Sequence, residues 1–264
     1  MVRSLNVLRY SAANAIADMR MLYTWKTWTF GWLGRMLAQV TFFTYLGRVL
    51  GGPGQVEYMV IGNAVMVAAI EAMIVVASSS WERDAGTLAL LLSAPADLTL
   101  VFLGRSVQWL FSGVLTSLVS IFVLAPAFGV RWHANQILPI LGLVPLTAVT
   151  TYCFGLFVSA LVLNASSLRN IVSNGLTAIM MSICGVEMSL SFWPRPVQAV
   201  AHTLPLTYAV EAMRRVAASA AWQSVLPQVG AALLAGVAWL GAAFLAFRLL
   251  GLRGRRAGTV DFAS

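Results

Sequence analysis

The sequence predicts an all-α, polytopic integral membrane protein, on the evidence of its composition, its long apolar runs and the placing of its basic residues. Of the 264 residues, 59% are hydrophobic and only 10% are charged, whereas a soluble domain carries roughly 25% charged residues. No globular core hides that much apolar surface, so lipid must solvate most of it. The net charge of +8 would suggest nucleic acid in a soluble protein. Here the basic residues separate apolar runs, so they bear on topology and no nucleic-acid partner is expected.

Six apolar runs are long enough for the helices of about 20 residues that cross a bilayer. They cover residues 29–50, 58–80, 99–128, 137–163, 170–189 and 228–250. Polar or turn-rich segments separate them, and neither an internal repeat nor a second soluble domain is visible. The sequence therefore predicts one domain, residues 1–264, with six transmembrane helices.

The basic residues predict the orientation. Six crossings place both termini on one face of the membrane, and twelve of the 17 basic residues fall on or near that face, against five on the other. Because cytoplasmic loops carry the excess of Lys and Arg, both termini are expected in the cytoplasm. Lys26 is the only lysine, and alanine is abundant, a composition typical of a high-GC bacterial genome. The expected location is thus a bacterial plasma (inner) membrane.

Residues 1–28 show a helical stripe ahead of the first apolar run. Apolar residues, from Leu5 to Tyr23, fall on one face, and most polar ones fall on the other. Trp25, Trp28 and Trp32 follow, and indole rings favour the headgroup boundary. We expect an amphipathic helix in the cytoplasmic interface; the alternative is a cytosolic helix packed on protein. Such a start differs from a secretory signal peptide, so the N-terminus is expected to be retained.

Residues 187–226 interrupt the pattern of apolar runs. They are too polar and too rich in proline to span the membrane. By the topology above they lie outside, as short helices that precede the last span and dip back into the outer leaflet.

The loop after the second run, residues 81–97, has the composition of a surface helix. Its acidic residues suit a helix start, and Pro95 ends the helix. Leu88, Leu91 and Leu92 lie on a short apolar face. Pattern alone does not distinguish a helix packed on its own chain from one that offers a leucine ridge to a partner.

This loop resembles the E-R-E-x-G-T-L-E-x-L-L-x-x-P motif of the type-2 ATP-binding-cassette export permeases. Asp84 and Ala89 stand where that family usually has Glu. A second segment, from Leu204 to Arg214, is similar to the family's N-P-L-T-Y-x-x-[DE]-A-[LM]-R sequence before the last helix, with Leu204 in place of Asn. The residues that carry the first resemblance are Glu82, Arg83, Gly86, Thr87, Leu88, Leu91 and Pro95.

The resemblance implies an exporter built from two permeases, identical or homologous, and two cytosolic ATPase subunits. It makes residues 81–97 a coupling helix that docks on the ATPase, through Glu82, Arg83, Asp84, Gly86, Thr87, Leu88 and Leu91. Residues 1–28 become the family's connecting helix. The helices before the last span become an extracellular gate that includes Pro205, Thr207, Tyr208, Glu211 and Arg214.

The substrate class stays open between alternatives. An apolar or amphipathic small molecule, such as a drug, an antibiotic or a lipid, suits the aliphatic and small residues of the spans. Export of a polysaccharide is the alternative within the family. A secondary transporter that runs without ATP is the rival from another class, and it would show broken helices in matching halves of the chain. A membrane partner that does not transport is a third possibility.

The sequence contains no catalytic motif, so the chain is not expected to be an enzyme. A phosphate-binding loop needs glycines before a Lys-Ser or Lys-Thr pair, and Lys26-Thr27 lacks them. No cofactor is expected, and ATP would be used by the partner. Cys153 and Cys184 lie in separate apolar runs, and the two histidines are far apart, so no metal site is expected.

Three ionisable residues fall at or near membrane depth, where they are candidates for function. Glu71 is the deepest acid, and Arg35 and Arg105 lie nearer the cytoplasmic face. We hypothesise that Glu71 pairs with Arg35 or Arg105, within or between subunits. The alternative is that both arginines extend to the surface while Glu71 is protonated or lines water.

A second charged group lies in the external segment. Glu211 is spaced for a helix-surface pair with Arg214 or Arg215, and Glu187 is a possible member of the same cluster.

Overall fold

The computed structural model describes residues 2–51, 53–78, 98–163 and 168–257. Every regular element among them is helical, as the sequence predicts. In chain order the elements are α1 (Val2–Leu22), η1 (Thr27–Leu33), α2 (Gly34–Gly51), α3 (Pro53–Ser78), α6 (Leu98–Arg105), α7 (Val107–Val119), η2 (Ser120–Leu124), α8 (Ala125–Ala127), α9 (Ala134–Val162), α10 (Arg169–Ile183), η4 (Leu190–Phe192), α11 (Arg195–Ala201), α12 (Pro205–Ala217) and α13 (Trp222–Ala257).

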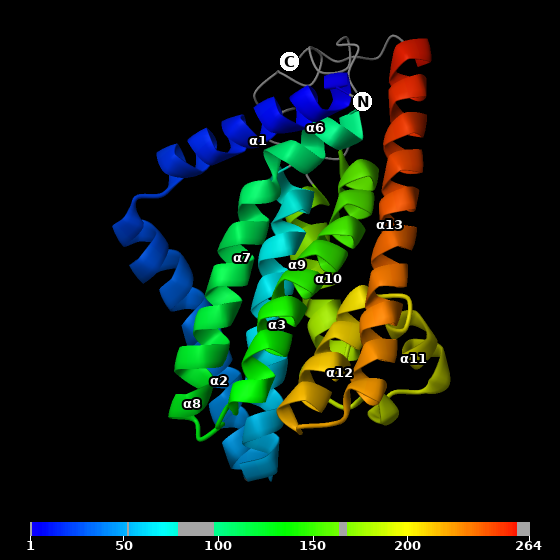
Figure 1. Cartoon of the computed structure of the whole chain (residues 1–264). Helices are drawn as coiled ribbons and strands as arrows, with labels where there is room; N and C mark the ends of the chain where they lie inside the picture. Colours follow the sequence, from blue (N-terminus) through cyan, green and yellow to red (C-terminus); the bar gives the residue numbers. More distant parts are fainter. Residues whose placement is uncertain (1, 52, 79–97, 164–167, 258–264) are drawn as a thin grey trace.

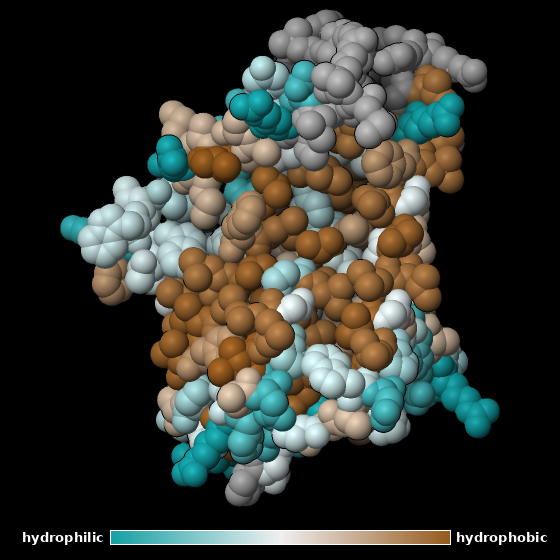
Figure 2. All heavy atoms as spheres, in the orientation of Figure 1, coloured by the Kyte–Doolittle hydropathy of each residue, from teal (hydrophilic) through white to brown (hydrophobic). Residues whose placement is uncertain are grey.

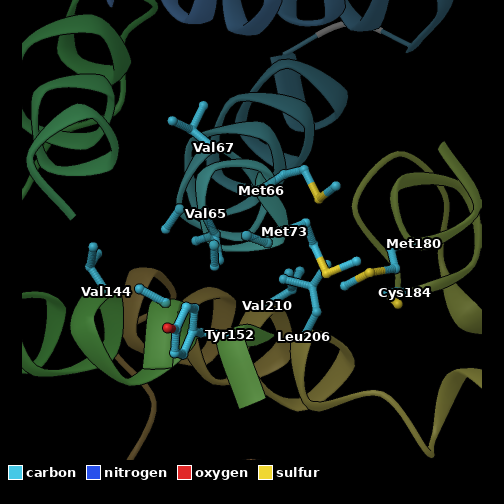
Figure 3. Packing of buried hydrophobic residues seen from close by; sticks show 14 of the residues in the cluster. Val65, Met66, Val67, Met73, Val144, Tyr152, Met180, Cys184, Leu206 and Val210 are labelled. Carbon is cyan, nitrogen blue, oxygen red and sulfur yellow. The ribbon is translucent and has the colours of Figure 1, made fainter. Parts of the chain in front are cut away.

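The long helices form a bundle around α3. Figure 1 shows α3, α7, α9, α10 and α13 along its long axis, with α1 and α6 across one end and α11 and α12 at the other. Helix α3 packs against α2, α7, α9, α10 and α12. Met66 and Met73 of α3 point toward Met180 and Cys184, at the end of α10 (Figure 3). Helix α3 has apolar residues on every side, which suits a helix that is mostly surrounded by protein.

Four described helical segments are long and apolar enough to cross a membrane. Their residues are Gly54–Ser78, Val107–Ala127, Ala134–Val162 and Trp222–Leu250. A broad apolar band covers the face seen in Figure 2, between hydrophilic side chains at its two ends. A surface of this kind is stable only against lipid or another apolar partner.

Four of the six predicted spans are therefore long and apolar enough in the structure to cross a membrane. The run at 29–50 becomes the π-helix η1 and the 18-residue helix α2, whose Arg35, Gln39 and Arg48 lower its apolar character. The run at 170–189 yields α10, which has only 15 residues and so extends about 22 Å, against about 30 Å of hydrocarbon. Gly185, with φ of +82°, follows the end of that helix, a conformation that glycine adopts readily.

The run at 99–128 is not one continuous helix. It breaks at Ser106, where φ is −110° and ψ is 4°, into α6 and α7. The Ser106 hydroxyl lies 2.6 Å from the Tyr152 hydroxyl, which also bonds the Leu103 carbonyl. Arg105 ends α6, which packs against α1, and the depth of this residue in the membrane stays a prediction.

Helix α1 lies across the end of the bundle where α13 also ends (Figure 1). Ala15 is fully buried, and Asp18 forms an ion pair with Arg105 of α6 at 3.2 Å. Ile16, which belongs to the predicted apolar face, is 46% exposed. The amphipathic helix thus has a protein contact, and its position in the membrane interface stays a prediction.

Candidate functional site

The segment that resembles the second family motif forms helix α12, and its polar residues fasten the start of that helix. Pro205 is the first residue of α12, a position that suits proline because its missing N–H would have no helical partner. The Thr207 hydroxyl donates to the carbonyl of Ala201, and the Tyr208 hydroxyl donates to that of His202 at 2.8 Å. These two bonds fix the turn between α11 and α12.

Glu211 and Arg215 make the ion pair of α12. Their side chains lie 2.8 Å apart with i,i+4 spacing. Arg215 also donates to the carbonyl of Ser224, at the start of α13. Spacing alone leaves Arg214 and Arg215 equivalent as partners of Glu211, and the structure selects Arg215.

Arg214 has a different role, because it joins α12 to two other parts of the chain. Its guanidinium lies over the Tyr58 ring of α3, 3.4 Å from the centroid. It donates to the backbone carbonyls of Gly185, Val186 (3.0 Å) and Tyr58 (3.3 Å). Burial lowers the pKa of Arg214 to about 10, so the side chain is still charged at neutral pH.

Two glycines make this junction possible. A Cβ atom on Gly62 of α3 would lie 2.4 Å from the carbonyl oxygen of Val186 and 2.8 Å from the Arg214 guanidinium. Gly185 has positive φ, and its carbonyl also accepts from the Tyr58 hydroxyl at 2.9 Å. The segment after α10 can therefore lie directly on α3.

Glu187 lies in the same junction, as the sequence suggested. Both of its carboxyl oxygens are buried and have no hydrogen-bond partner in the part of the chain that the structure describes. Burial raises the pKa of Glu187 to about 7, against the opposing effects of Asn63 and Arg214. The carboxyl group is thus held close to its titration point at neutral pH.

The three charges predicted at membrane depth do not form the expected pair in this structure. Glu71 is fully buried on α3, and its carboxyl oxygens have no hydrogen-bond partner among the described residues. Arg35 stacks on the Trp32 ring, 4.9 Å from its centroid, and Arg105 pairs with Asp18. The polar side chains around the Glu71 carboxyl include Ser112, Thr116 and Trp32.

The predicted coupling helix, residues 81–97, lies outside the described residues. Its candidate docking side chains are Glu82, Arg83, Asp84, Gly86, Thr87, Leu88 and Leu91. The helices before and after this segment are described: α3 ends at Ser78 and α6 begins at Leu98. Figure 1 shows α6 beside α1.

Sequence reasoning missed the residues of α3 that receive Arg214. Tyr58 and Gly62 lie in an apolar run and belong to no recognisable motif. A glycine in the middle of a predicted span is the one available signal, because it often marks a close approach of two backbones. Within the described residues, no three His, Cys, Asp or Glu side chains are grouped to hold a metal ion, and Cys153 and Cys184 are buried free thiols.

The helical bundle, its long apolar helices and its apolar outer band define a multi-pass membrane protein. A family model described as ABC-2 type transporter matches residues 12–217, a range that includes both motif segments. The chain belongs to the ABC-2 type transporter family and is the membrane-embedded permease component of an ABC-type transporter. A comparison of the chain with curated proteins found no match.

Proposed function

We propose that this chain is the permease subunit of an exporter that moves an apolar or amphipathic small molecule out of the cytoplasm, powered by a separate ATPase subunit. The observation that carries the proposal is the family match over residues 12–217. On this proposal residues 1–264 form one domain, whose spans are completed to six by η1–α2 and α10, in the inner membrane of a bacterium.

The topology of the described helices supports a docking surface for the ATPase at one end of the bundle. Helix α1 and the C-terminal end of α13 share that end (Figure 1). The 79–97 segment connects α3 to α6, which packs against α1. With twelve of 17 basic residues assigned to this face, it is the cytoplasmic one, and two ATPase copies would bind there through the coupling helices of two permeases, identical or homologous.

Five hydroxyl groups of the bundle that are bonded to backbone carbonyls favour an apolar substrate over a glycan. The hydroxyls of Thr44, Thr116, Thr147 and Thr150 each donate to a carbonyl of the same helix, and that of Ser117 donates to Ala64 on α3. Groups already bonded to the backbone are not free to replace the water around a sugar. A path made from these helices would offer chiefly apolar contacts.

Purification of the detergent-solubilised chain tests the partner. The variants Glu82→Ala and Leu88→Asp remove a charge and an apolar contact of the coupling helix, and Leu88→Ile is the matched control. We expect wild type and Leu88→Ile to co-purify an ATPase, identified by mass spectrometry, and Leu88→Asp to lose it. Absence of any ATPase from folded wild-type protein would overturn the proposal.

Transport by the complex tests the direction and the substrate class. In inside-out vesicles we expect ATP-dependent uptake of a fluorescent amphipathic dye. Uptake that follows an imposed proton gradient and ignores ATP would instead establish a secondary transporter. Movement of a labelled polysaccharide without movement of the dye would establish the glycan alternative.

A further inference from the structure

Three buried polar groups without a partner meet where the segment after α10 packs on α3 and α12. They are the carboxyl of Glu187, the side-chain oxygen of Asn63 and Nε of Arg214, and none of these atoms has a hydrogen-bond partner in the described structure. Buried polar groups are normally hydrogen-bonded, because desolvation without compensation is unfavourable. Three such groups at one junction call for a common explanation.

We propose that Glu187 is a proton-binding site, in which the neutral carboxylic acid donates a hydrogen bond to Asn63 and the ionised carboxylate pairs with Nε–H of Arg214. One side chain thereby has two alternative partners on two different helices. The protonated form contacts α3, and the ionised form contacts α12.

The bonding of Asn63 supports the protonated arrangement. Its amide nitrogen donates to the carbonyl of Met59 at 3.0 Å, and its amide oxygen is a buried acceptor without a partner among the described residues. The second N–H of the amide could donate to an ionised carboxylate, but the amide oxygen cannot bond to the carboxyl group unless one of them carries a proton. The carboxylic acid is the group that can carry it, and burial of Glu187 favours that neutral form.

The bonding of Arg214 supports the ionised arrangement. Its two terminal nitrogens are occupied by the carbonyls of Gly185, Val186 and Tyr58. Nε is the one nitrogen of the guanidinium that has no hydrogen-bond partner among the described residues. A carboxylate bonded there would gain a charge-assisted hydrogen bond without breaking any of the others.

The other ionisable groups around the junction do not compete for this role. Glu211 is paired with Arg215 on α12, and the Tyr58 hydroxyl donates to Gly185. Burial raises the pKa of Cys184 to about 12, so it remains a thiol. Glu187 is therefore the group of this junction expected to exchange a proton near neutral pH.

If the helices before α13 form the external gate, as the proposed function implies, the proton on Glu187 decides whether the side chain of that residue is bonded to α3 or to α12. The pH outside the cell would then bias that junction directly. The proton site itself depends on neither the ATPase nor the substrate, and it can be tested without them.

Infrared spectroscopy of the purified full chain, titrated from about pH 5 to 9, around the value near 7 for Glu187, tests the site. We expect a carboxylic-acid C=O band that disappears as pH rises, with a midpoint near 7. The band should be absent from Glu187→Gln and present in the control Glu211→Gln, whose carboxylate is paired. A titrating band that survives Glu187→Gln, or no titrating band in wild type, would overturn the proposal.

A second variant tests the two partners. Asn63→Leu has a similar volume but cannot accept from the acid. If Asn63 accepts from the protonated acid, the midpoint should fall by about one pH unit, the shift that corresponds to one hydrogen bond. If the Asn63 amide instead donates to the carboxylate, the midpoint should rise, and that result would overturn the arrangement with two alternative partners. An unchanged midpoint in Asn63→Leu would remove Asn63 as the partner. Because no ATPase or substrate is present, these results stand whether or not export is observed.

Discussion

The guanidinium of Arg214 lies 3.4 Å from the centroid of the Tyr58 ring, although 156 positions separate the two residues in the sequence. Both side chains donate to the same carbonyl, that of Gly185. This junction joins α3, α12 and the segment after α10 at the end of the bundle opposite α1. It has several consequences that can be measured.

Arg214→Lys should destabilise the protein, because an ammonium group cannot reach three carbonyls in the fork geometry of a guanidinium. Loss of charged hydrogen bonds worth about 1.5–3 kcal/mol each predicts a decrease of about 3 kcal/mol in the free energy of unfolding, or roughly 6–12 °C in Tm. Thermal unfolding in detergent measures it. The adjacent Arg215→Lys is the control, and its exposed ion pair should cost less than about 1 kcal/mol. Equal effects of the two variants would contradict the special position of Arg214.

Gly62→Ala should destabilise the same junction by steric conflict. The added Cβ would lie 2.4 Å from the Val186 carbonyl oxygen, so the backbones must separate, at a cost of about 1–3 kcal/mol. Gly142→Ala on α9 is the matched control, because no atom lies within 4 Å of its added Cβ. There the better helix propensity of alanine should leave Tm unchanged or slightly raised.

Glu71→Gln should leave stability unchanged or improve it. The carboxyl is buried without an ion pair among the described residues, so an amide of the same shape removes no salt bridge and avoids a buried charge.

The single variant Glu71→Arg should abolish transport, because it places a positive charge where the buried carboxyl lies. The double variant Glu71→Arg with Arg35→Glu, which exchanges the two charges, should fail to restore transport. Recovery in the double variant would show that the two residues pair in another state of the transporter or across subunits.

The stability of the protein should fall as pH rises from about 4.5 to about 7, because of Glu187. Its pKa is raised from 4.5 to about 7 in the folded state, so the folded protein binds the proton more tightly than the unfolded chain. Loss of this proton from the folded state, as pH rises through that window, removes the stability that proton binding supplies. Tm should therefore be higher at pH 5 than at pH 8. Glu187→Gln should flatten this dependence, whereas Glu211→Gln should retain it.

The ion pair between Asp18 and Arg105 should contribute little. Its side chains are 44% and 30% exposed, respectively, and such pairs are worth about 0.2–1 kcal/mol. A double-mutant cycle with Asp18→Asn and Arg105→Gln measures the coupling, which should weaken further in high salt. A coupling well above 1 kcal/mol would mean that the contact between α1 and α6 is better shielded from water than its exposure indicates.

The long apolar helices were predictable because a bilayer imposes a minimum length on them. The two predicted spans that the structure does not confirm, at 29–50 and 170–189, concern runs interrupted by charged or polar side chains or ended early by a turn. The run at 99–128 illustrates the same limit: it continues through Ser106 in the sequence, and only the backbone angles of Ser106 in the structure show where the helix breaks. The hydrophobicity of the sequence gives the length of an apolar run but does not locate the bends or breaks of the helix within it.

The residues of the candidate gate likewise include some that the sequence explains and others whose contacts only the structure shows. The motif identified Pro205, Thr207, Tyr208, Glu211 and Arg214, and local bonds of α12 account for the first four. The partners of Arg214 lie on α3 and after α10, at sequence distances that no periodicity connects. Glu187 was suspected from its position, but its burial beside Asn63 and Arg214 required the packed structure.

Composition, apolar run length and two motifs were sufficient to predict an all-helical membrane protein of the ABC-2 type. This is because a need for lipid as solvent and a tendency to form helices both depend on residues that are consecutive in the sequence. The packing of distant helices decided the rest: which arginine of α12 is free of Glu211, where the third run breaks, and which acid is left near its titration point. Those properties depend on burial and on contacts between remote residues, and both arise only when the helices are assembled.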